Sequence, residues 1–456
     1  MGTRKSDLAD GNIKKLLFKM SLPAILAQVI NLLYNMVDRM FIGRIKDVGA
    51  LALTGVGVTL PIIIVIAAFA ALVSMGAAPR ASIMLGKNKV DEAEKIMGNS
   101  FSAIVISSLL ITTLIILFSK DILLALGASS DTIVYAIKYI NIYALGSLFV
   151  QLTLGLNAFI TAQGFAKTSM YTILIGAILN IILGPILIFG FNLGVQGAAI
   201  ATVISQAMSA LWVILFLNSD KTTIRLKLKN LVLKKDIILP SLFLGLSPFI
   251  MQITESILAV VFNTSLQRYG GDLAVGTMTI LTSVMQFSLL PLVGLTQGSQ
   301  PIISYNYGAN NLDRVKDTFI LLLKVAIAYS TSLWLLIMIK PDLFAKIFTT
   351  DQALINMVVF NLRLFMSMSF LFSVQIVCQQ TFIALNNAKT SIFLALLRKV
   401  ILLIPLIYIL PRLFSNQVFA IFLAEPVADT LAVIITASVA YVSFRKIFFN
   451  KKSSEL

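Results

Sequence analysis

The sequence lacks histidine altogether and has a single cysteine, Cys378, among its 456 residues. Without histidine, the chain cannot build a Ser-His-Asp triad or a site that holds zinc or haem through imidazole. A lone cysteine cannot form an internal disulfide, and it leaves a thiolate-ligated metal centre without its other ligands. We therefore expect no resident metal or cofactor, and no enzyme that works through histidine or a transition metal.

Charge is also scarce. Only 12% of the residues are charged, whereas 58% are hydrophobic. A soluble protein of this length could not hide so much apolar surface. The composition predicts an all-α polytopic membrane protein, because a helix satisfies its own backbone hydrogen bonds in lipid. No glycine-rich phosphate loop follows a strand-like run, so we expect no ATP-driven step within this chain.

Twelve apolar runs are long enough to cross a bilayer as transmembrane helices. Their approximate limits are 14–43, 50–77, 96–118, 132–162, 168–190, 195–217, 237–266, 273–300, 316–340, 353–385, 390–410 and 416–444. We expect an N-terminal six-helix lobe over 1–218 and a C-terminal six-helix lobe over 237–456. A basic cytoplasmic linker over 219–236 joins them.

Lysine and arginine gather in alternate connections between the spans, and most densely in the linker Ser219–Asp236 and in the tail after Arg445. The positive-inside rule places these segments in the cytoplasm, together with both termini. We expect the chain in the cytoplasmic (inner) membrane. The net charge of +16 is therefore a signal of topology, and we expect no nucleic-acid partner. The linker pattern suits an amphipathic helix lying on the inner leaflet.

The two halves repeat short motifs in the same order, about 220 residues apart. Residues 21–23 recur at 246–248, and AKTS at 166–169 recurs at 388–391. The run LGKNKVDEAEK after Pro79 recurs as YGANNLDRVKD after Pro301. Each half has six spans, so both insert the same way up and form a parallel, pseudo-two-fold repeat. This design favours alternating access between two lobes; the other reading is a duplicated scaffold without a moving part.

The first span carries a polar stripe that ends in a carboxylate. Gln28, Asn31, Asn35 and Asp38 share one face at about 100° per residue. Such a face cannot point into lipid. Burial disfavours the charged form of a carboxylate, so Asp38 is suited to take up a proton or a metal cation. The three amides are then candidates for a substrate cavity. The alternative is that the stripe only holds helices together.

The seventh span carries a carboxylate of its own, Glu255, one helical turn from Gln252. No partner for Glu255 is present in its own helix. We therefore regard Glu255 as a second candidate for cation coupling and Gln252 as a candidate for the substrate cavity. As with the first span, a polar contact between helices is the alternative reading.

The twelfth span holds Glu425 and Asp429, one helical turn apart beside Pro426. Arg398 and Lys399 lie within the eleventh span and could neutralise this pair. Two readings stay open here. The residues Arg398, Glu425 and Asp429 form either a secondary charged site with a role in coupling or a charge-paired structural site.

The eighth and tenth spans supply further cavity candidates. The eighth offers Met278, Met285 and Gln286, and the tenth offers Gln375 and Gln379. Methionine side chains adapt to varied apolar ligands, and aromatic faces such as those in the tenth span attract organic cations. Ordinary helix packing is the alternative explanation for each of these side chains.

The chain resembles the multidrug and toxic compound extrusion (MATE) family of the MOP flippase superfamily over nearly its whole length, and the DinF-like bacterial branch most of all. The resemblance rests on the duplicated plan and on three runs: SLPAILAQVINLLYNMVDRMFIGR from residue 21, LNIILGPILIFGFNLGVQGAAIAT at 179–202, and LPLVGLTQGSQPIISYNYGANN at 290–311. It implies two lobes in a V around a central cavity. It also implies export of organic cations or amphiphilic drugs in exchange for Na⁺ or H⁺.

The resemblance assigns roles to particular residues. Asp38 matches the family's first-helix aspartate, and Asn180 and Thr202 match other polar members of its N-lobe cation site. Many DinF-like members place an aspartate four residues after that asparagine, where this chain has Gly184. A possible Na⁺ site at Asp38 would therefore lack one carboxylate. Glu255 is similar to the seventh-helix glutamate of other branches, whose tenth-helix aspartate has no counterpart here.

Two other functions are alternatives to a cation-coupled multidrug antiporter. A lipid-linked saccharide flippase of the same superfamily would need a strongly cationic cavity to hold pyrophosphate. An intramembrane aspartyl protease would need two carboxylates facing each other across a water. The antiporter fits the intramembrane carboxylates better, so we expect a transporter and not an enzyme. Its expected partners are an organic cation or drug, H⁺ or Na⁺, and the lipid bilayer, and we expect it to act as a monomer in xenobiotic export.

Overall fold

The computed structural model describes residues 7–449, and helices account for nearly all of them. Residues 1–6 and 450–456, which include both predicted cytoplasmic termini and part of the basic tail, lie outside this range. The first half holds α1 (Asp7–Asp10), α2 (Ile13–Gly43), α3 (Gly49–Val58), α4 (Leu60–Gly86), α5 (Val90–Ala125), α6 (Ile133–Leu145), α7 (Ser147–Ala162), α8 (Ala166–Pro185), the π-helical turn η1 (Ile186–Gly190) and α9 (Gly194–Asn218).

The second half follows a connection that contains the 3-10 turn η2 (Leu228–Asn230). It holds α10 (Lys235–Gly308), α11 (Leu312–Ile339), α12 (Pro341–Phe348), α13 (Gln352–Phe365), α14 (Ser369–Ala384), α15 (Ala388–Leu396), the π-helical segment η3 (Leu397–Leu403), α16 (Ile404–Leu413) and α17 (Gln417–Phe449). No strand occurs within residues 7–449.

The twelve predicted spans are present among the described residues. Nine helices are long and apolar enough to cross a membrane singly. Two further spans are bent pairs, α6 with α7 at 53° and α13 with α14 at 50°. The 74-residue α10 contains a break at Gly271, whose φ of 60° and ψ of −160° are not helical, and it therefore makes two spans. The chain is a twelve-helix, multi-pass membrane protein.

The predicted second span, 50–77, is wrong at its start. Residues 49–58 form the separate short helix α3, and the crossing helix α4 runs from Leu60 to Gly86. Pro61 lies in the first turn of α4, where its missing N–H breaks no helical hydrogen bond. The proline within the apolar run thus marks the start of the crossing helix.

The basic linker does not form the amphipathic helix that its sequence pattern predicts. Between Ser219 and Lys234, η2 is its only helical turn. Side chains of the first half hold its backbone instead. The Gln163 Oε1 atom accepts hydrogen bonds from Thr223 N at 2.8 Å and Ile224 N at 2.9 Å, and Asn99 Oδ1 accepts one from Lys234 N at 2.6 Å. These bonds compete with the backbone bonds that a helix would need.

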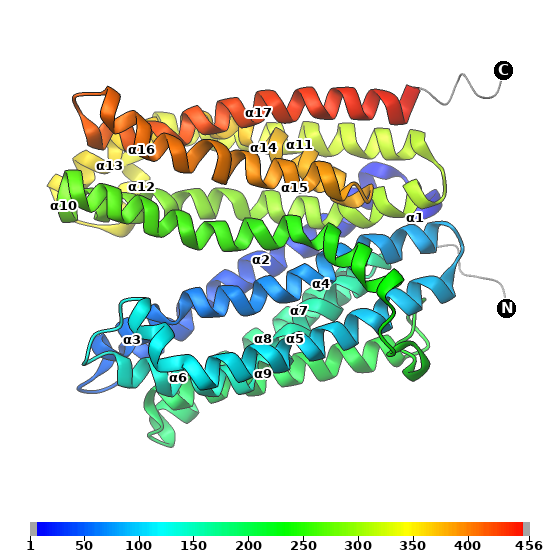
Figure 1. The fold of residues 1–456 in the computed structure, drawn as a ribbon, viewed down its shortest axis with the longest axis horizontal. Helices are drawn as coiled ribbons and strands as arrows, with labels where there is room; N and C mark the ends of the chain where they lie inside the picture. The colour runs from blue at the N-terminus through cyan, green and yellow to red at the C-terminus, as the bar shows by residue number, and fades with distance from the viewer. Residues whose placement is uncertain (1–6, 450–456) are drawn as a thin grey trace.

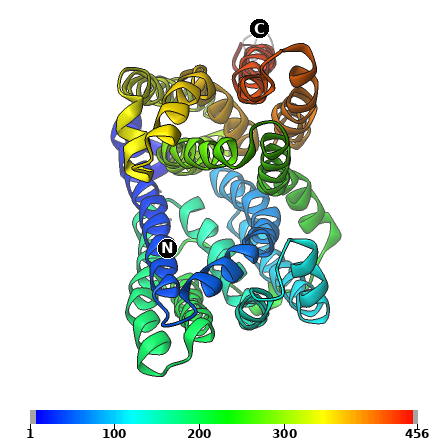
Figure 2. The ribbon, with the colours of Figure 1, turned by 90° about the vertical axis from the view of Figure 1, so that its left-hand side faces the viewer.

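The two halves form two helix bundles that diverge toward one end of the molecule. Figure 1 shows α2 to α9 in one bundle and α10 to α17 in the other, with α3 and α6 at the end where they separate. The ends of the described chain lie at the opposite end, where the bundles meet. Figure 2, viewed from the divergent end, shows the same two groups of helices. The predicted V of two six-helix lobes is therefore the observed shape.

Close contacts between α4 and α10, at the end where the bundles meet, occur at equivalent positions of the sequence repeat. A Cβ atom on Gly86 would collide with the carbonyl of Tyr305, and one on Gly308 would collide with the carbonyl of Ile83. Gly76 lies equally close to the backbone of α10. The absence of side chains lets α4 and α10 touch through their backbones. The two contacts are pseudo-two-fold copies of each other, as expected for a parallel repeat.

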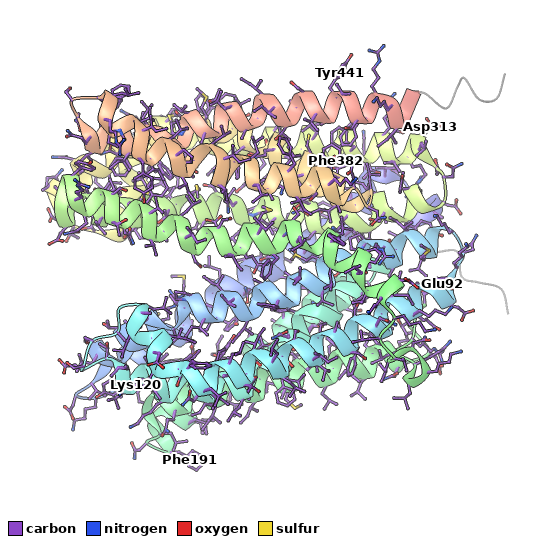
Figure 3. All side chains as sticks on the ribbon, viewed as in Figure 1. Glu92, Lys120, Phe191, Asp313, Phe382 and Tyr441 are labelled. Carbon is purple, nitrogen blue, oxygen red and sulfur yellow. The ribbon has the colours of Figure 1, made fainter. Side chains whose placement is uncertain are left out.

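Helix α2 crosses from one bundle to the other. Near its start, Leu16 and Met20 pack in a core cluster with Phe382 of α14. Near its end, Ile42 packs in a different cluster with Ile140 of α6. The polar stripe predicted in this helix therefore begins in the region between the bundles. Figure 3 shows all side chains on the two bundles, with Phe382 labelled in the second. This crossing places Asp38 in the first half and the beginning of α2 against the second.

Candidate functional site

A cavity of about 490 Å³ lies between the bundles, bounded by α2, α4, α7, α8, α9 and α10. Three predicted cavity residues, Gln28, Asn31 and Gln252, line it. Its other lining residues are mostly alanine, serine, threonine, asparagine and glutamine, and none of the described lining residues is acidic or basic. The volume suits a small organic molecule. The cavity is thus neutral, with many hydrogen-bonding groups.

One direct side-chain hydrogen bond crosses the cavity between the halves. Gln28 Nε2 on α2 donates to Gln297 Oε1 on α10 at 2.9 Å. The bond is partly buried, and both glutamines line the cavity. A ligand that fills the cavity would have to displace this bond or bind beside it. Gln297 belongs to the quoted run LPLVGLTQGSQ, yet it was not predicted as a cavity residue.

Asp38, Asn180 and Thr202 are all buried, and two of them are in contact. Asn180 Nδ2 donates to Thr202 Oγ1 at 3.0 Å, and Thr202 Oγ1 donates to the carbonyl of Ala198 at 3.1 Å. Asp38 is 8% exposed, and its Oδ1 atom has no hydrogen-bond partner among the described residues. The Oδ1 atom of Asn180 is likewise buried without a donor. Oxygens in this condition suit a proton or a cation.

This polar group lies one helical turn beyond the cavity on each of its three helices. On α2, Tyr34 lines the cavity and Asp38 follows four residues later. The same offset separates Gly176 from Asn180 on α8, and Gln206 from Thr202 on α9. Four residues make about one turn, or roughly 6 Å. The candidate cation-coupling residues therefore lie beside the cavity and outside its lining.

Gly184 faces the part of α2 that carries Asp38. A Cβ atom built on Gly184 would lie 3.4 Å from the ring of Phe41. Phe41 follows Asp38 by three residues and so lies near it on the helix surface. The position is buried. A side chain introduced at residue 184 would therefore point toward the Asp38 region.

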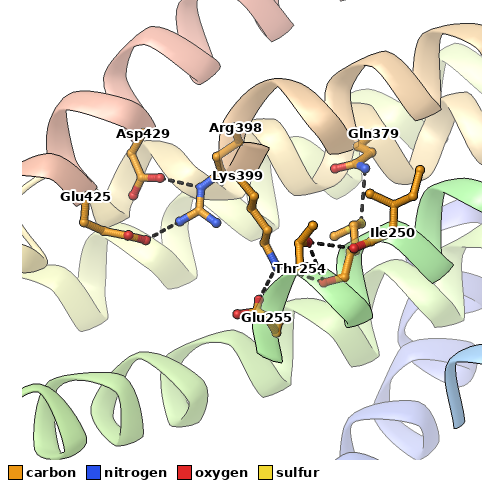
Figure 4. Close-up of polar contacts among 9 residues, drawn as sticks. Ile250, Thr254, Glu255, Gln379, Arg398, Lys399, Glu425 and Asp429 are labelled. Carbon is orange, nitrogen blue, oxygen red and sulfur yellow. Dashed lines mark hydrogen bonds and ion pairs between the residues drawn. The ribbon is translucent and has the colours of Figure 1, made fainter. Parts of the chain in front are cut away.

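Glu255 has a partner that the sequence did not reveal. Lys399 of η3 forms an ion pair with Glu255 and donates to the carbonyl of Met251 at 3.1 Å (Figure 4). The Glu255 side chain is 52% exposed, whereas that of Lys399 is 6% exposed. Lys399 therefore forms its ion pair with Glu255 and not with Glu425 or Asp429. Adjacent residues on a helix point about 100° apart, so Arg398 and Lys399 reach different neighbours.

Arg398 alone holds both carboxylates of the twelfth span. Its Nε atom donates to Asp429 Oδ1 and its Nη2 atom donates to Glu425 Oε1, each at 2.5 Å (Figure 4). The guanidinium also lies 4.1 Å from the ring centroid of Phe372 on α14. The predicted pairing of Arg398 with Glu425 and Asp429 is present in the structure.

Six of the predicted cavity residues do not line the cavity between the bundles. Asn35 donates to the carbonyl of Asn31, Gln379 donates to Ser247 Oγ, and Met278 lies in a core cluster. The remaining three are Met285, Gln286 and Gln375. Met278, Gln375 and Gln379 are buried in the helix packing of the second half, whereas Asn35 and Gln286 are exposed outside this lining. The cavity is instead lined by α7, α8 and α9. The asparagine, serine and threonine residues within these apolar helices were the sequence feature that could have predicted this lining.

Comparison with known proteins agrees with this geometry. The MatE family model matches residues 23–186 and again 248–409. Multidrug export protein MepA of Staphylococcus aureus (strain NCTC 8325 / PS 47) is 28% identical over 426 residues, which cover 92% of this chain and 93% of that protein. Multidrug export protein MepA of Staphylococcus haemolyticus (strain JCSC1435) is 27% identical over 432 residues, covering 94% of each.

Solved structures show the same fold. A crystal structure of MATE in the bent conformation superposes with a TM-score of 0.92 at 20% identity and covers 100% of both chains. An outward-facing conformation of a multidrug resistance MATE family transporter of the MOP superfamily gives a TM-score of 0.89 at 20% identity, covering 97% of this chain and 98% of that one.

Proposed function

Since this chain belongs to the MatE family of membrane transporters, we propose that it exports amphiphilic organic cations and drugs in exchange for a cation, by alternating access between its two halves. The relatives named as multidrug export proteins support the substrate class. The observation that carries the proposal is the neutral cavity of about 490 Å³ between the halves, one helical turn from the buried carboxylate of Asp38.

The cavity chemistry suits bulky substrates of varied shape. Its alanines offer apolar contacts, and amides such as Gln28 and Gln252 offer hydrogen bonds in several directions. A lipophilic cation can be held here through apolar contacts and the dipoles of these amides, without an ion pair. A lipid-linked saccharide flippase is disfavoured, because no basic side chain is among the described residues that line the cavity.

The coupling ion that we propose is a proton, taken up at Asp38. A Na⁺ site wants several oxygen ligands around a fixed carboxylate. Here Asn180 and Thr202 bind each other, and residue 184 has no carboxylate to add. A single buried carboxylate with a free oxygen is instead suited to bind and release a proton as the cavity opens to either side.

Alternating access follows from the shape of the molecule. The bundles touch near the ends of the described chain and diverge at the other end. If the basic connections lie in the cytoplasm of a bacterial inner membrane, this conformation opens outward. Rocking the halves about the α4–α10 contact would close the wide end and open the narrow one. We propose that one chain suffices, because the cavity is formed within a single copy.

Accumulation of tetraphenylphosphonium by proteoliposomes tests this function. We expect the purified chain to drive uphill uptake when a pH gradient is imposed without Na⁺, and empty liposomes to show none. A Na⁺ gradient at fixed pH should drive little uptake. Uptake with Na⁺ alone, and none with the pH gradient, would reject proton coupling. No uptake under either gradient would reject the cation-coupled antiporter.

A further inference from the structure

A second group of buried charges lies in the other half of the molecule, away from the cavity and from Asp38. It consists of Arg398 on η3 with Glu425 and Asp429 on α17 (Figure 4). These side chains are 5%, 3% and 5% exposed, respectively. One guanidinium thus faces two carboxyl groups inside the membrane-spanning part of the chain.

The charges in this group do not balance. The adjacent cation, Lys399, is already paired with Glu255. Two basic and three acidic side chains therefore make up the connected cluster, and full ionisation would leave it with an excess of one negative charge. The other titratable residue that lines this region is Tyr329 on α11, whose hydroxyl donates to the carbonyl of Ser288. An uncompensated charge buried at this depth is strongly unfavourable.

A small cavity of about 20 Å³ adjoins the same three side chains. It is also lined by Ser330 and Trp334, whose Oγ and Nε1 atoms are buried without a hydrogen-bond partner among the described residues. Ser330 is 6% exposed. This volume holds about one water molecule. A water there would join the unpartnered groups to the carboxyl oxygens.

The surroundings favour a proton over a metal ion. The rest of the small cavity is lined largely by leucine, isoleucine, phenylalanine and methionine, which supply no hard oxygen ligands. The Trp334 indole N–H is a donor and would oppose a bound cation. Among residues 7–449, no group of three or more His, Cys, Asp or Glu side chains could hold a metal ion. A proton needs only one carboxyl oxygen and a neighbouring water.

We propose that Arg398, Glu425 and Asp429 hold one exchangeable proton, shared between the two carboxyl groups, and that this is a second coupling site in the C-terminal half. On uptake, an O–H bond forms between a carboxylate oxygen and a proton delivered by water in the small cavity; on release, that proton returns to water. The inference extends the proposed cation-coupled export, which assigns only Asp38.

The π-helical segment η3 connects this proton to the cavity between the halves. Arg398 reaches α17, while its neighbour Lys399 reaches Glu255 on α10. Glu255 lies one turn from Gln252, which lines the large cavity. Loss of the shared proton would add a negative charge beside Arg398 and Lys399. This charge would attract Lys399 and weaken its ion pair with Glu255. Segments of π-helix are frequent at functional sites of this kind.

Thermal unfolding of the purified full chain in detergent, at about pH 6 and about pH 9, tests the proton directly. The folded protein holds the proton more tightly than the unfolded chain, so its contribution to stability is present at low pH and is lost as the pH rises. We expect wild type and Asp38→Asn to lose stability over this range. Glu425→Gln and Asp429→Asn should lose markedly less, because one carboxyl is permanently neutral. Asp342→Asn, which removes an exposed ion-pair carboxylate, should behave as wild type.

The proposal would be overturned if Glu425→Gln lowered the unfolding temperature by the same amount at both pH values, so that the pH dependence of wild type remained. The cluster would then be a structural ion pair. If that variant does not fold, infrared spectra decide. We expect a protonated carboxyl C=O band in Asp38→Asn at about pH 6 that disappears by about pH 9 and is absent from the double variant Asp38→Asn with Asp429→Asn. No such band would reject the site. Neither measurement involves transport, so rejection here leaves the antiporter and Asp38 untouched.

Discussion

At the scale of single residues, the candidate cation site depends on what residue 184 lacks. Gly184 is buried and faces the segment of α2 that carries Asp38. Asp38 and Asn180 each present a buried oxygen with no donor among the described residues. Two neutral ligands and one carboxylate are a poor Na⁺ site, whereas a second carboxylate would supply both charge and oxygens.

We therefore predict that Gly184→Asp strengthens Na⁺ binding by about tenfold, equal to roughly 1.4 kcal/mol. The measurement is Na⁺-dependent protection against thermal unfolding, followed by uptake driven by a Na⁺ gradient. Gly190→Asp is the matched control, since a Cβ atom there meets nothing within 4 Å. Equal Na⁺ affinity in both variants would mean that residue 184 does not contribute to a site with Asp38.

The sequence predicted some of these side chains and missed others for a physical reason. The stripe Gln28, Asn31 and Asp38 could be predicted because helical spacing within one element fixes which side chains share a face. The partner of Glu255 could not, because Lys399 lies 144 residues away and reaches it only through the packing of η3 on α10. Spacing also cannot tell a polar face that lines a cavity from one that packs on a neighbour, as Gln379 does.

At the scale of elements, the order and number of spans could be predicted from apolar runs alone. The breaks could not be placed equally well. The apolar run at 50–77 hides the division between α3 and α4, and the break in α10 depends on the backbone of Gly271. The sequence pattern of the linker predicts a helix that does not form, because its backbone N–H groups donate to side chains of other elements, such as Gln163 and Asn99.

The glycine contacts between α4 and α10 give a prediction of definite sign. Glycine-to-alanine changes inside a helix ordinarily stabilise by about 0.5–1 kcal/mol. Gly308→Ala should instead destabilise by about 1–3 kcal/mol, because its Cβ atom would collide with the carbonyl of Ile83. Gly57→Ala on α3 is the control, since its Cβ atom meets nothing within 4 Å.

The unfolding temperatures of the two variants in detergent check this prediction. A lower value for Gly308→Ala and an unchanged or higher value for Gly57→Ala are expected. If both variants were as stable as wild type, α4 and α10 would not be in backbone contact near the narrow end, and the pivot proposed for alternating access would lose its support.

At the scale of the whole molecule, the two bundles should move against each other. In a Cys378→Ala background, we predict that the pair Gln28→Cys and Gln297→Cys cross-links in the present conformation, since these side chains are hydrogen-bonded at 2.9 Å. The pair Met40→Cys and Gln267→Cys, near the divergent ends of their helices, should cross-link only after the wide end closes. Substrate and a pH gradient should shift the yields of the two pairs in opposite directions. If neither substrate nor the pH gradient changed the cross-linking yields, the two bundles would behave as one rigid body.

The central claim is that a cation taken up at Asp38 drives export through the neutral cavity. Tetraphenylphosphonium uptake into proteoliposomes under an imposed pH gradient, compared between wild type and Asp38→Asn, tests it most directly. We predict that Asp38→Asn folds and binds the probe with an affinity close to that of wild type, because Asp38 is outside the cavity lining. Its uphill uptake should fall by at least about tenfold. Concentrative uptake by Asp38→Asn at the wild-type rate would contradict the claim and leave Asp38 as a contact between helices.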